Sequence, residues 1–224
     1  MQKTTLEKFI RNYHLGGEIN SVKWTFKGDS LETNFVSPCK SLRGSVKLDK
    51  VNISSSEIGI YQTDTFLKML KVLDDNLDIS IWPEAEAPIN LKATSGKTSM
   101  DYPLAELSVI PTVTPFKKNP IDEGNDITKI KIDSKFISKF LDAKSSLPDE
   151  DIFSFVRDKE GNLNVIIGYV QGRNTNRITI PVESEQDNLV DTISFNAKLF
   201  AKVIEANREC TSSVLEISNE GIAR

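Results

Sequence analysis

Apolar residues in this sequence follow two periods, one typical of helices and one typical of strands. Four stretches have the helical period, in which apolar residues recur three and four positions apart. Each contains a lysine followed at once by two apolar residues, and these lysines are Lys8, Lys68, Lys139 and Lys202. Their spacings of 60, 71 and 63 residues are nearly even. The repetition predicts one supersecondary unit used four times.

The predicted helices cover residues 3–13, 65–73, 134–144 and 196–208. In the third, Phe136, Ile137, Phe140 and Leu141 fall on one face, and the fourth repeats this spacing. Residues that favour helix starts precede three of the helices, and they are Thr63-Asp64, Asp133-Ser134 and Asn196.

Between the helices the apolar period drops toward two, which predicts strands. The predicted strands are residues 22–26, 77–81, 89–93, 127–132, 152–156, 163–167, 178–180 and 214–217. Glycine-containing turns follow at 27–29, 95–98, 159–162 and 218–221. The predicted unit is a strand, a short helix and about three antiparallel strands, so the fold class is α+β.

A proline-rich stretch interrupts these periods near the middle of the chain. Residues 110–124 contain three prolines and have no period, which is typical of an extended, stiff connector. We therefore expect two similar domains, 1–110 and 126–224, joined by residues 111–125. A return strand begins after the last turn and stops at Arg224. The last strand is thus expected to be incomplete, which implies either a longer gene product or an unpaired sheet edge.

Charge separates the predicted helices from the rest of the chain. Each predicted helix has a net charge of +2, whereas the whole chain has −4, so the remainder has −12. The basic residues of the helices are Lys3, Lys8, Arg11, Lys68, Lys71, Lys135, Lys139, Lys144, Lys198, Lys202 and Arg208. This segregation favours one basic surface in an otherwise acidic shell. Lysines on ordinary solvated helix faces are the simpler explanation for any single helix.

Composition excludes several classes of protein. With 38% hydrophobic and 27% charged residues the chain is typical of a soluble globular protein. No apolar run approaches the ~20 residues that span a bilayer, and the N-terminal residues lack an apolar signal core. Cys39 and Cys210 are far apart, so we expect free thiols and a cytoplasmic location.

Catalytic and cofactor signals are weak. Residues 95–98, Ser-Gly-Lys-Thr, lack the upstream glycine of a phosphate-binding loop, so a hairpin turn is expected there. His14 stands beside two glycines, where a helix C-terminal cap is expected. Arg173 and Arg177 could contact DNA or a neighbouring subunit, or lie in a solvated loop. We predict no enzyme activity, no cofactor and no metal site.

Three stretches, together with the halves and the connector, resemble a DNA sliding clamp, the polymerase processivity factor. They are residues 58–80, residues 100–105 with the connector through Pro120, and residues 128–134. The resemblance is strongest to the clamps of T-even-type bacteriophages and covers most of the chain as an order of elements. The family closes with a further hairpin strand and tail, which this chain lacks.

The resemblance implies a homotrimeric ring in which twelve helices line a pore and sheets form the outer wall. The basic helix residues named above would face duplex phosphates without reading sequence. An ATP-dependent clamp loader would open the ring, and the replicative DNA polymerase would insert its C-terminal peptide into an apolar pocket. Connectors lie beside such pockets, which makes Val109, Ile110, Val113 and Phe116 the candidates. A cytoplasmic role in viral DNA replication follows.

A second hypothesis stays open at this point. The same repeated sheets could build a non-enzymatic ring or scaffold of a virus that encircles no DNA. The basic helices favour the clamp.

Overall fold

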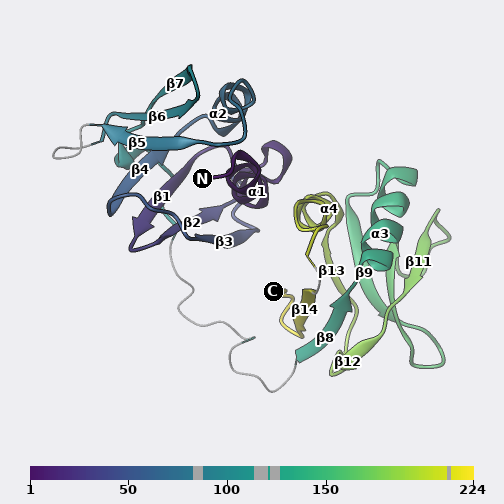
Figure 1. Cartoon of the computed structure of the whole chain (residues 1–224). Helices are drawn as coiled ribbons and strands as arrows, with labels where there is room; N and C mark the ends of the chain where they lie inside the picture. Colours follow the sequence, from purple (N-terminus) through teal and green to yellow (C-terminus); the bar gives the residue numbers. More distant parts are fainter. Residues whose placement is uncertain (83–87, 114–120, 122–126, 211–212) are drawn as a thin grey trace. The chain divides into compact units, whose positions relative to one another are not determined.

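The computed structural model describes residues 1–82, 88–113, 121, 127–210 and 213–224. The chain forms two compact units, Met1–Thr114 and Pro115–Arg224, and each is described by itself (Figure 1). The predicted connector, 111–125, falls mostly outside the described residues.

Unit 1 contains two helices, seven strands and two short 3₁₀ turns among the described residues. In chain order they are α1 (Lys3–His14), η1 (Leu15–Gly17), β1 (Val22–Lys27), β2 (Ser30–Val36), β3 (Arg43–Asp49), β4 (Ser56–Ile60), α2 (Thr63–Leu70), β5 (Asp78–Trp82), β6 (Asn90–Ser95), β7 (Thr98–Pro103) and η2 (Leu107–Val109).

The strands of unit 1 form two antiparallel sheets, with orders β3-β2-β1-β4 and β5-β6-β7. The helices α1 and α2 pack against each other, α1 also against β3 and α2 against β7 (Figure 1). Trp24 is 1% exposed and forms edge-to-face contacts with Phe9, Tyr13, Phe26 and Phe66. These aromatic contacts fix the first helix and the second helix to the same strand.

Unit 2 contains two helices and seven strands among the described residues. In chain order they are β8 (Ile127–Ile132), α3 (Ser134–Ser146), β9 (Ile152–Arg157), β10 (Leu163–Ile167), β11 (Ile178–Pro181), β12 (Ser184–Gln186), β13 (Ile193–Asn196), α4 (Ala197–Ala206) and β14 (Ser213–Ser218).

Unit 2 repeats the plan of unit 1. Its sheets have the orders β11-β10-β9-β13 and β12-β8-β14, and α3 packs against α4. The first of these orders corresponds to β3-β2-β1-β4 element for element. Phe140, Phe153 and Phe200 stack with centroids 4.8–5.1 Å apart and place both helices on strand β9. The core is therefore built separately in each unit.

The eight predicted strands are all present, with bounds that differ by at most two residues. The predicted turn at 95–98 joins β6 to β7, with Gly96 at φ +58°. Strands β2, β3, β4, β7, β12 and β13 lay outside the predicted strands. The three-residue β12 is too short to show an alternation of apolar and polar residues, whereas the edge strand β3 alternates over residues 45–49 and was still missed.

The residues after β14 turn back on it, as the sequence predicted. The backbones of Glu216 and Arg224 exchange two hydrogen bonds of 2.8 Å, and Ile217 forms a bridge with Ala223. The Arg224 guanidinium also donates to the Glu216 carboxylate at 2.7 Å. This edge of β14 is thus paired over residues 222–224.

Candidate nucleic-acid interface

Helix α1 directs its apolar residues inward and leaves a basic face outside. Leu6, Phe9 and Ile10 are at most 3% exposed, whereas Lys8 and Arg11 are exposed. These two cations are three positions apart, so they lie on one side of the helix, one turn from each other. They can reach an external anion without moving the core.

Helix α2 is shorter than predicted. It begins at Thr63 and ends at Leu70, so Lys71 lies just beyond it. Phe66 and Leu70 are buried, and Lys68 is exposed between them. Asp64 lies in the first turn of the helix.

Helices α3 and α4 begin at the predicted caps. The Asp133 side chain accepts from the Phe136 N–H at 2.7 Å, and the Asn196 side chain accepts from the Leu199 N–H at 2.8 Å. These bonds satisfy helix N–H groups that have no partner within the helix. With the starts fixed, the cations fall on the outer faces: Lys135, Lys139 and Lys198 are exposed, and Lys202 is half-buried.

Several of the predicted cations have protein partners for their head groups, among them Lys3, Lys144 and Arg208. The Lys3 ammonium donates to the carbonyl of Leu73, and the Lys144 ammonium donates to the carbonyl of Pro148 at 2.7 Å. Arg208 lies outside α4, 3.5 Å from the Glu205 carboxylate. Lys144 therefore satisfies carbonyl groups just after its own helix, which is a common position for a cation.

The observed helix bounds reduce the charge contrast expected from the sequence. Helices α1 and α3 each carry +2, but α2 carries no net charge because Asp64 balances Lys68. Helix α4 carries +1 because Arg208 lies beyond it. The helices thus sum to +5 rather than +8, and the rest of the chain to −9 rather than −12. The helices are still basic and the rest of the chain acidic, as predicted, but the difference in net charge between them is smaller.

His14 is the last residue of α1, and its ring contacts the second helix of unit 1. Its Nε2 atom lies 3.2 Å from the Asp64 carboxylate in the first turn of α2. The C-cap residue of the helix is Leu15, which has φ +49°, and not His14 as expected from the sequence. Tyr13 links the same two helices, with its hydroxyl 3.4 Å from the Thr63 hydroxyl, and burial raises the pKa of Tyr13. These contacts join the end of α1 to the start of α2.

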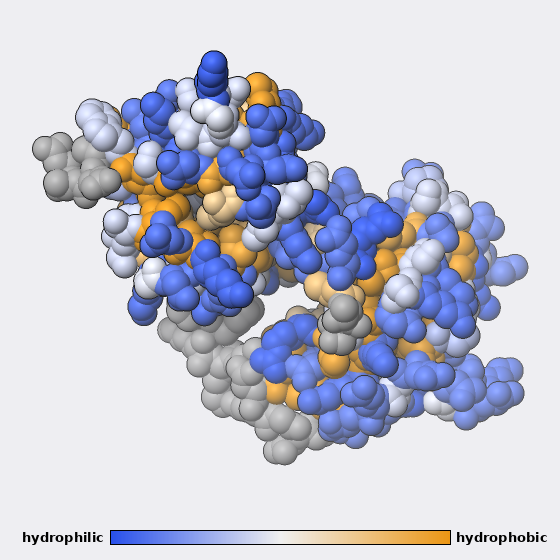
Figure 2. Space-filling view, in the orientation of Figure 1, coloured by the Kyte–Doolittle hydropathy of each residue, from blue (hydrophilic) through white to orange (hydrophobic). Residues whose placement is uncertain are grey.

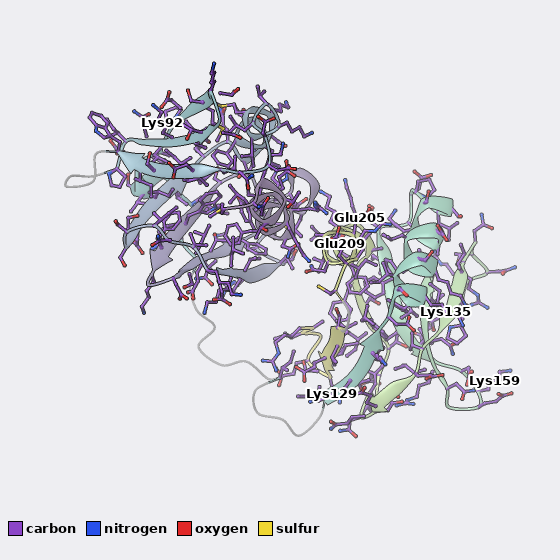
Figure 3. The ribbon with its side chains drawn as sticks, viewed as in Figure 1. Lys92, Lys129, Lys135, Lys159, Glu205 and Glu209 are labelled. Atoms are coloured by element: carbon purple, nitrogen blue, oxygen red, sulfur yellow. The ribbon has the colours of Figure 1, made fainter. Side chains whose placement is uncertain are left out.

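A groove of about 590 Å³ separates α3 from α4. Its lining has both signs of charge and comprises Leu141, Asp142, Lys144, Ser145, Pro148, Asp151, Lys198, Ala201 and Glu205. Figure 3 shows Lys135 on α3 and Glu205 on α4. Among the described residues no group of three or more His, Cys, Asp or Glu side chains could hold a metal ion.

The candidate residues for a peptide pocket are only partly within the described chain. Ile110 is 6% exposed, and its side chain packs beside Gly59, where an added Cβ would lie 3.1 Å from Ile110 Cγ1. Val109 is 59% exposed, Val113 is half-buried, and Phe116 lies outside the described residues.

Comparison of the whole fold with solved structures is decisive for its class. A structure titled as the C-terminal region of FEN-1 bound to A. fulgidus PCNA has a TM-score of 0.67 and 15% identity, over 97% of this chain and 85% of that one. The C. crescentus beta sliding clamp has a TM-score of 0.68 and 12% identity, over 98% of this chain and 59% of that one. The chain has the DNA sliding-clamp fold.

A further comparison defines how far this likeness extends. A putative DNA polymerase III beta subunit from Eubacterium rectale has a TM-score of 0.65 and 16% identity, over 100% of this chain and 62% of that one. The chain therefore spans about three fifths of the two bacterial proteins. No protein-family model and no curated protein matches the sequence.

The clamp fold agrees with the α+β class and the two similar units predicted from the sequence. Polar side chains cover most of the visible surface of each unit (Figure 2). No helix in the described parts of the chain is long and apolar enough to cross a membrane.

Proposed function

We propose that this chain is a subunit of a sliding clamp that encircles duplex DNA and tethers a DNA polymerase for processive synthesis. The observation that supports this most is the set of exposed cations on the helices of a clamp fold. Lys8 and Lys68 lie opposite the buried residues of their helices, and Lys139 and Lys198 are exposed on the flanks of theirs. Mobile lysines attract phosphates without fixing a register, which suits a protein that slides.

The finer parts of the proposal come from the resemblance to T-even-type bacteriophage clamps. Three subunits with two units each would close the ring by a head-to-tail contact repeated three times. An ATP-dependent loader would open it, and a polymerase C-terminal peptide would bind beside Val109, Ile110, Val113 and Phe116. The PCNA structure bound to the C-terminal region of FEN-1 supports peptide binding by this fold. The protein would be a non-enzymatic accessory factor in the cytoplasm of the infected cell.

Topological retention tests this function without a loader. The protein is threaded onto a linear duplex, both biotinylated ends are blocked with streptavidin, and the sample is washed with high salt. A clamp stays on the blocked duplex and leaves after a single restriction cut. Equal retention on cut and uncut duplex would contradict encirclement, because simple electrostatic binding is lost with salt in both cases. Sedimentation equilibrium of the free protein measures the number of subunits.

A ring or scaffold without a DNA role is the competing function. It would form the same oligomer but would not be retained on the blocked duplex, and it would leave polymerase processivity unchanged.

A further inference from the structure

Each unit has a hairpin turn at an equivalent position, the β2–β3 turn in unit 1 and the β10–β11 turn in unit 2. In unit 1 the carbonyl of Asn20, just before β1, accepts the first N–H of α2 at 3.0 Å. The β2–β3 turn, 37–42, lies at this same end, because β2 runs antiparallel to β1 and Lys23 pairs with Asn34. The turn is closed by a 2.8 Å bond from Ser37 N–H to Leu42 O.

Unit 2 repeats the arrangement. The carbonyl of Asp151, just before β9, accepts the first N–H of α4 at 2.8 Å. The β10–β11 turn, 168–177, starts beside it, since the Gly168 N–H donates to Ile152 O at 3.5 Å. The Thr175 hydroxyl donates to Gly168 O at 2.6 Å and closes the turn. In both units, therefore, this turn lies where the first helix ends and the second begins.

The two turns share a basic charge pattern, although the chain as a whole is acidic. Residues 33–48 contain no Asp or Glu, and Lys40 and Arg43 lie at the turn, whereas Lys47 lies farther along β3 and pairs with Asp49 and Glu32. Residues 161–182 contain Arg173 and Arg177 and again no acid. Lys40, Arg173 and Arg177 are exposed. Hydroxyl and amide side chains lie between the cations, and they are Ser41, Asn174, Thr175 and Asn176.

The turns at the opposite ends of the same sheets lack this pattern. The β1–β2 turn has Asp29 beside Lys27, and the β9–β10 turn has Asp158 and Glu160 around Lys159. Figure 3 shows Lys159 at the far tip of unit 2. Acidic residues also lie near the basic turns, at Asp64 in unit 1 and at 149–151 in unit 2. The basic character is thus confined to the turns themselves.

We propose that the β2–β3 and β10–β11 turns form a second contact with duplex DNA, through Lys40, Arg173 and Arg177. The chemistry fits phosphates: lysine and arginine supply charge, and the neighbouring hydroxyl and amide groups supply hydrogen-bond donors. The contact would extend the basic surface of the helices past their ends without reading base sequence. It rests on the proposed clamp function.

Cys39 gives this proposal a direct test. It is exposed in the first turn, next to Lys40, and can carry a maleimide-linked benzophenone in a Cys210→Ser background. Two matched probes use a Cys39→Ser/Cys210→Ser background. One is Lys139→Cys on the outer face of α3, and the other is Lys27→Cys in the opposite turn of the same sheet as Cys39. Each labelled protein is threaded onto the linear duplex, the ends are then blocked, and the sample is washed with high salt and irradiated.

The three probes separate failure of the inference from failure of the function. We expect DNA adducts from Cys39 and from Lys139→Cys, both several-fold above Lys27→Cys. Adducts from Lys139→Cys alone would overturn the second contact and leave the clamp intact. Adducts from none of the probes, together with loss of retention, would overturn both.

Charge removal gives an independent measure on the unlabelled protein. Lys40→Ser/Arg173→Ser should reduce the slope of log affinity against log salt by about 0.9 for each phosphate that is no longer neutralised. Lys27→Ser/Lys159→Ser removes the same charge from the opposite turns and should leave the slope unchanged. Equal slopes for the two double variants would also overturn the proposal.

Discussion

At the residue scale, lysine ammonium groups have different roles that depend on their neighbours. Lys3 and Lys144 satisfy backbone carbonyls, whereas Lys139 and Lys198 stay exposed on outer helix faces. The sequence could not tell the paired lysines from the exposed ones. The partners of Lys3 and Lys144 are the carbonyls of Leu73 and Pro148, whose positions depend on where the chain turns. The caps Asp133 and Asn196 were predictable, since their acceptor bonds span only three residues.

The two predicted caps should each stabilise unit 2. Asp133→Ala and Asn196→Ala remove a side-chain acceptor at a helix start, which costs about 0.5–2 kcal/mol. Thermal unfolding followed by far-UV circular dichroism should show a lower midpoint for each variant. Gln62→Ala is the control, because Gln62 precedes α2 without a side-chain cap bond. A midpoint for Asp133→Ala no lower than that of Gln62→Ala would contradict the role of the cap.

The Cys39 thiol should ionise near neutral pH. Hydrogen bonds from the hydroxyls of Ser37 and then Ser41 lower its pKa from 9.0 to about 7. Because the thiolate is the nucleophile, the alkylation rate should rise as pH passes through 7 and level off above it. Mass spectrometry of a Cys210→Ser variant measures this profile. Ser37→Ala should move its midpoint to higher pH, and an unmoved midpoint would show that the hydroxyl has no such effect.

At the element scale, the sequence predicted the long, regular elements well. It predicted poorly those element boundaries that depend on contacts with residues distant in the sequence. Helix α2 was expected to start after Thr63-Asp64, but it starts at Thr63 because Asn20 provides the acceptors. The Asn20 side chain accepts from the Asp64 N–H at 3.0 Å, across 44 residues of sequence. No local pattern contains such a partner.

Removing this distant cap should loosen the start of α2. Asn20→Ala deletes the side-chain acceptor and should lower the stability of unit 1 by about 1 kcal/mol. Asp151→Ala is the matched control, because the equivalent contact in unit 2 uses only the Asp151 backbone carbonyl. Amide hydrogen exchange at Asp64 would report the change directly. Unchanged exchange in Asn20→Ala would mean that the backbone contact alone holds the helix.

At the scale of the whole molecule, repetition was the most informative signal in the sequence. Four lysine-apolar-apolar motifs predicted two units with two helices each, and the fold has this plan. What repetition could not give is the size of the basic surface, because net charge depends on where each helix ends. The peptide pocket and the ring contact involve surfaces that one chain cannot define.

Charge reversal on the outer helix faces should impair the proposed clamp without unfolding it. Lys68→Glu/Lys139→Glu/Lys198→Glu places three carboxylates where phosphates are expected, so retention on the end-blocked duplex should fall many-fold. Lys27→Glu/Lys92→Glu/Lys159→Glu changes the total charge equally on exposed strand and turn positions. The control should be retained like the wild type. Equal retention of both variants would contradict the assignment of the helices to the DNA surface.

The separate cores have a consequence for spectroscopy. Both tryptophans of the chain, Trp24 and Trp82, belong to unit 1, and Trp24 is the buried centre of its aromatic cluster. Tryptophan emission should therefore follow unit 1 alone during urea unfolding, while far-UV circular dichroism follows both units. We expect the two curves to diverge if the units unfold independently, and to coincide if their unfolding is coupled. Tryptophan fluorescence thus reports on unit 1 without any added label.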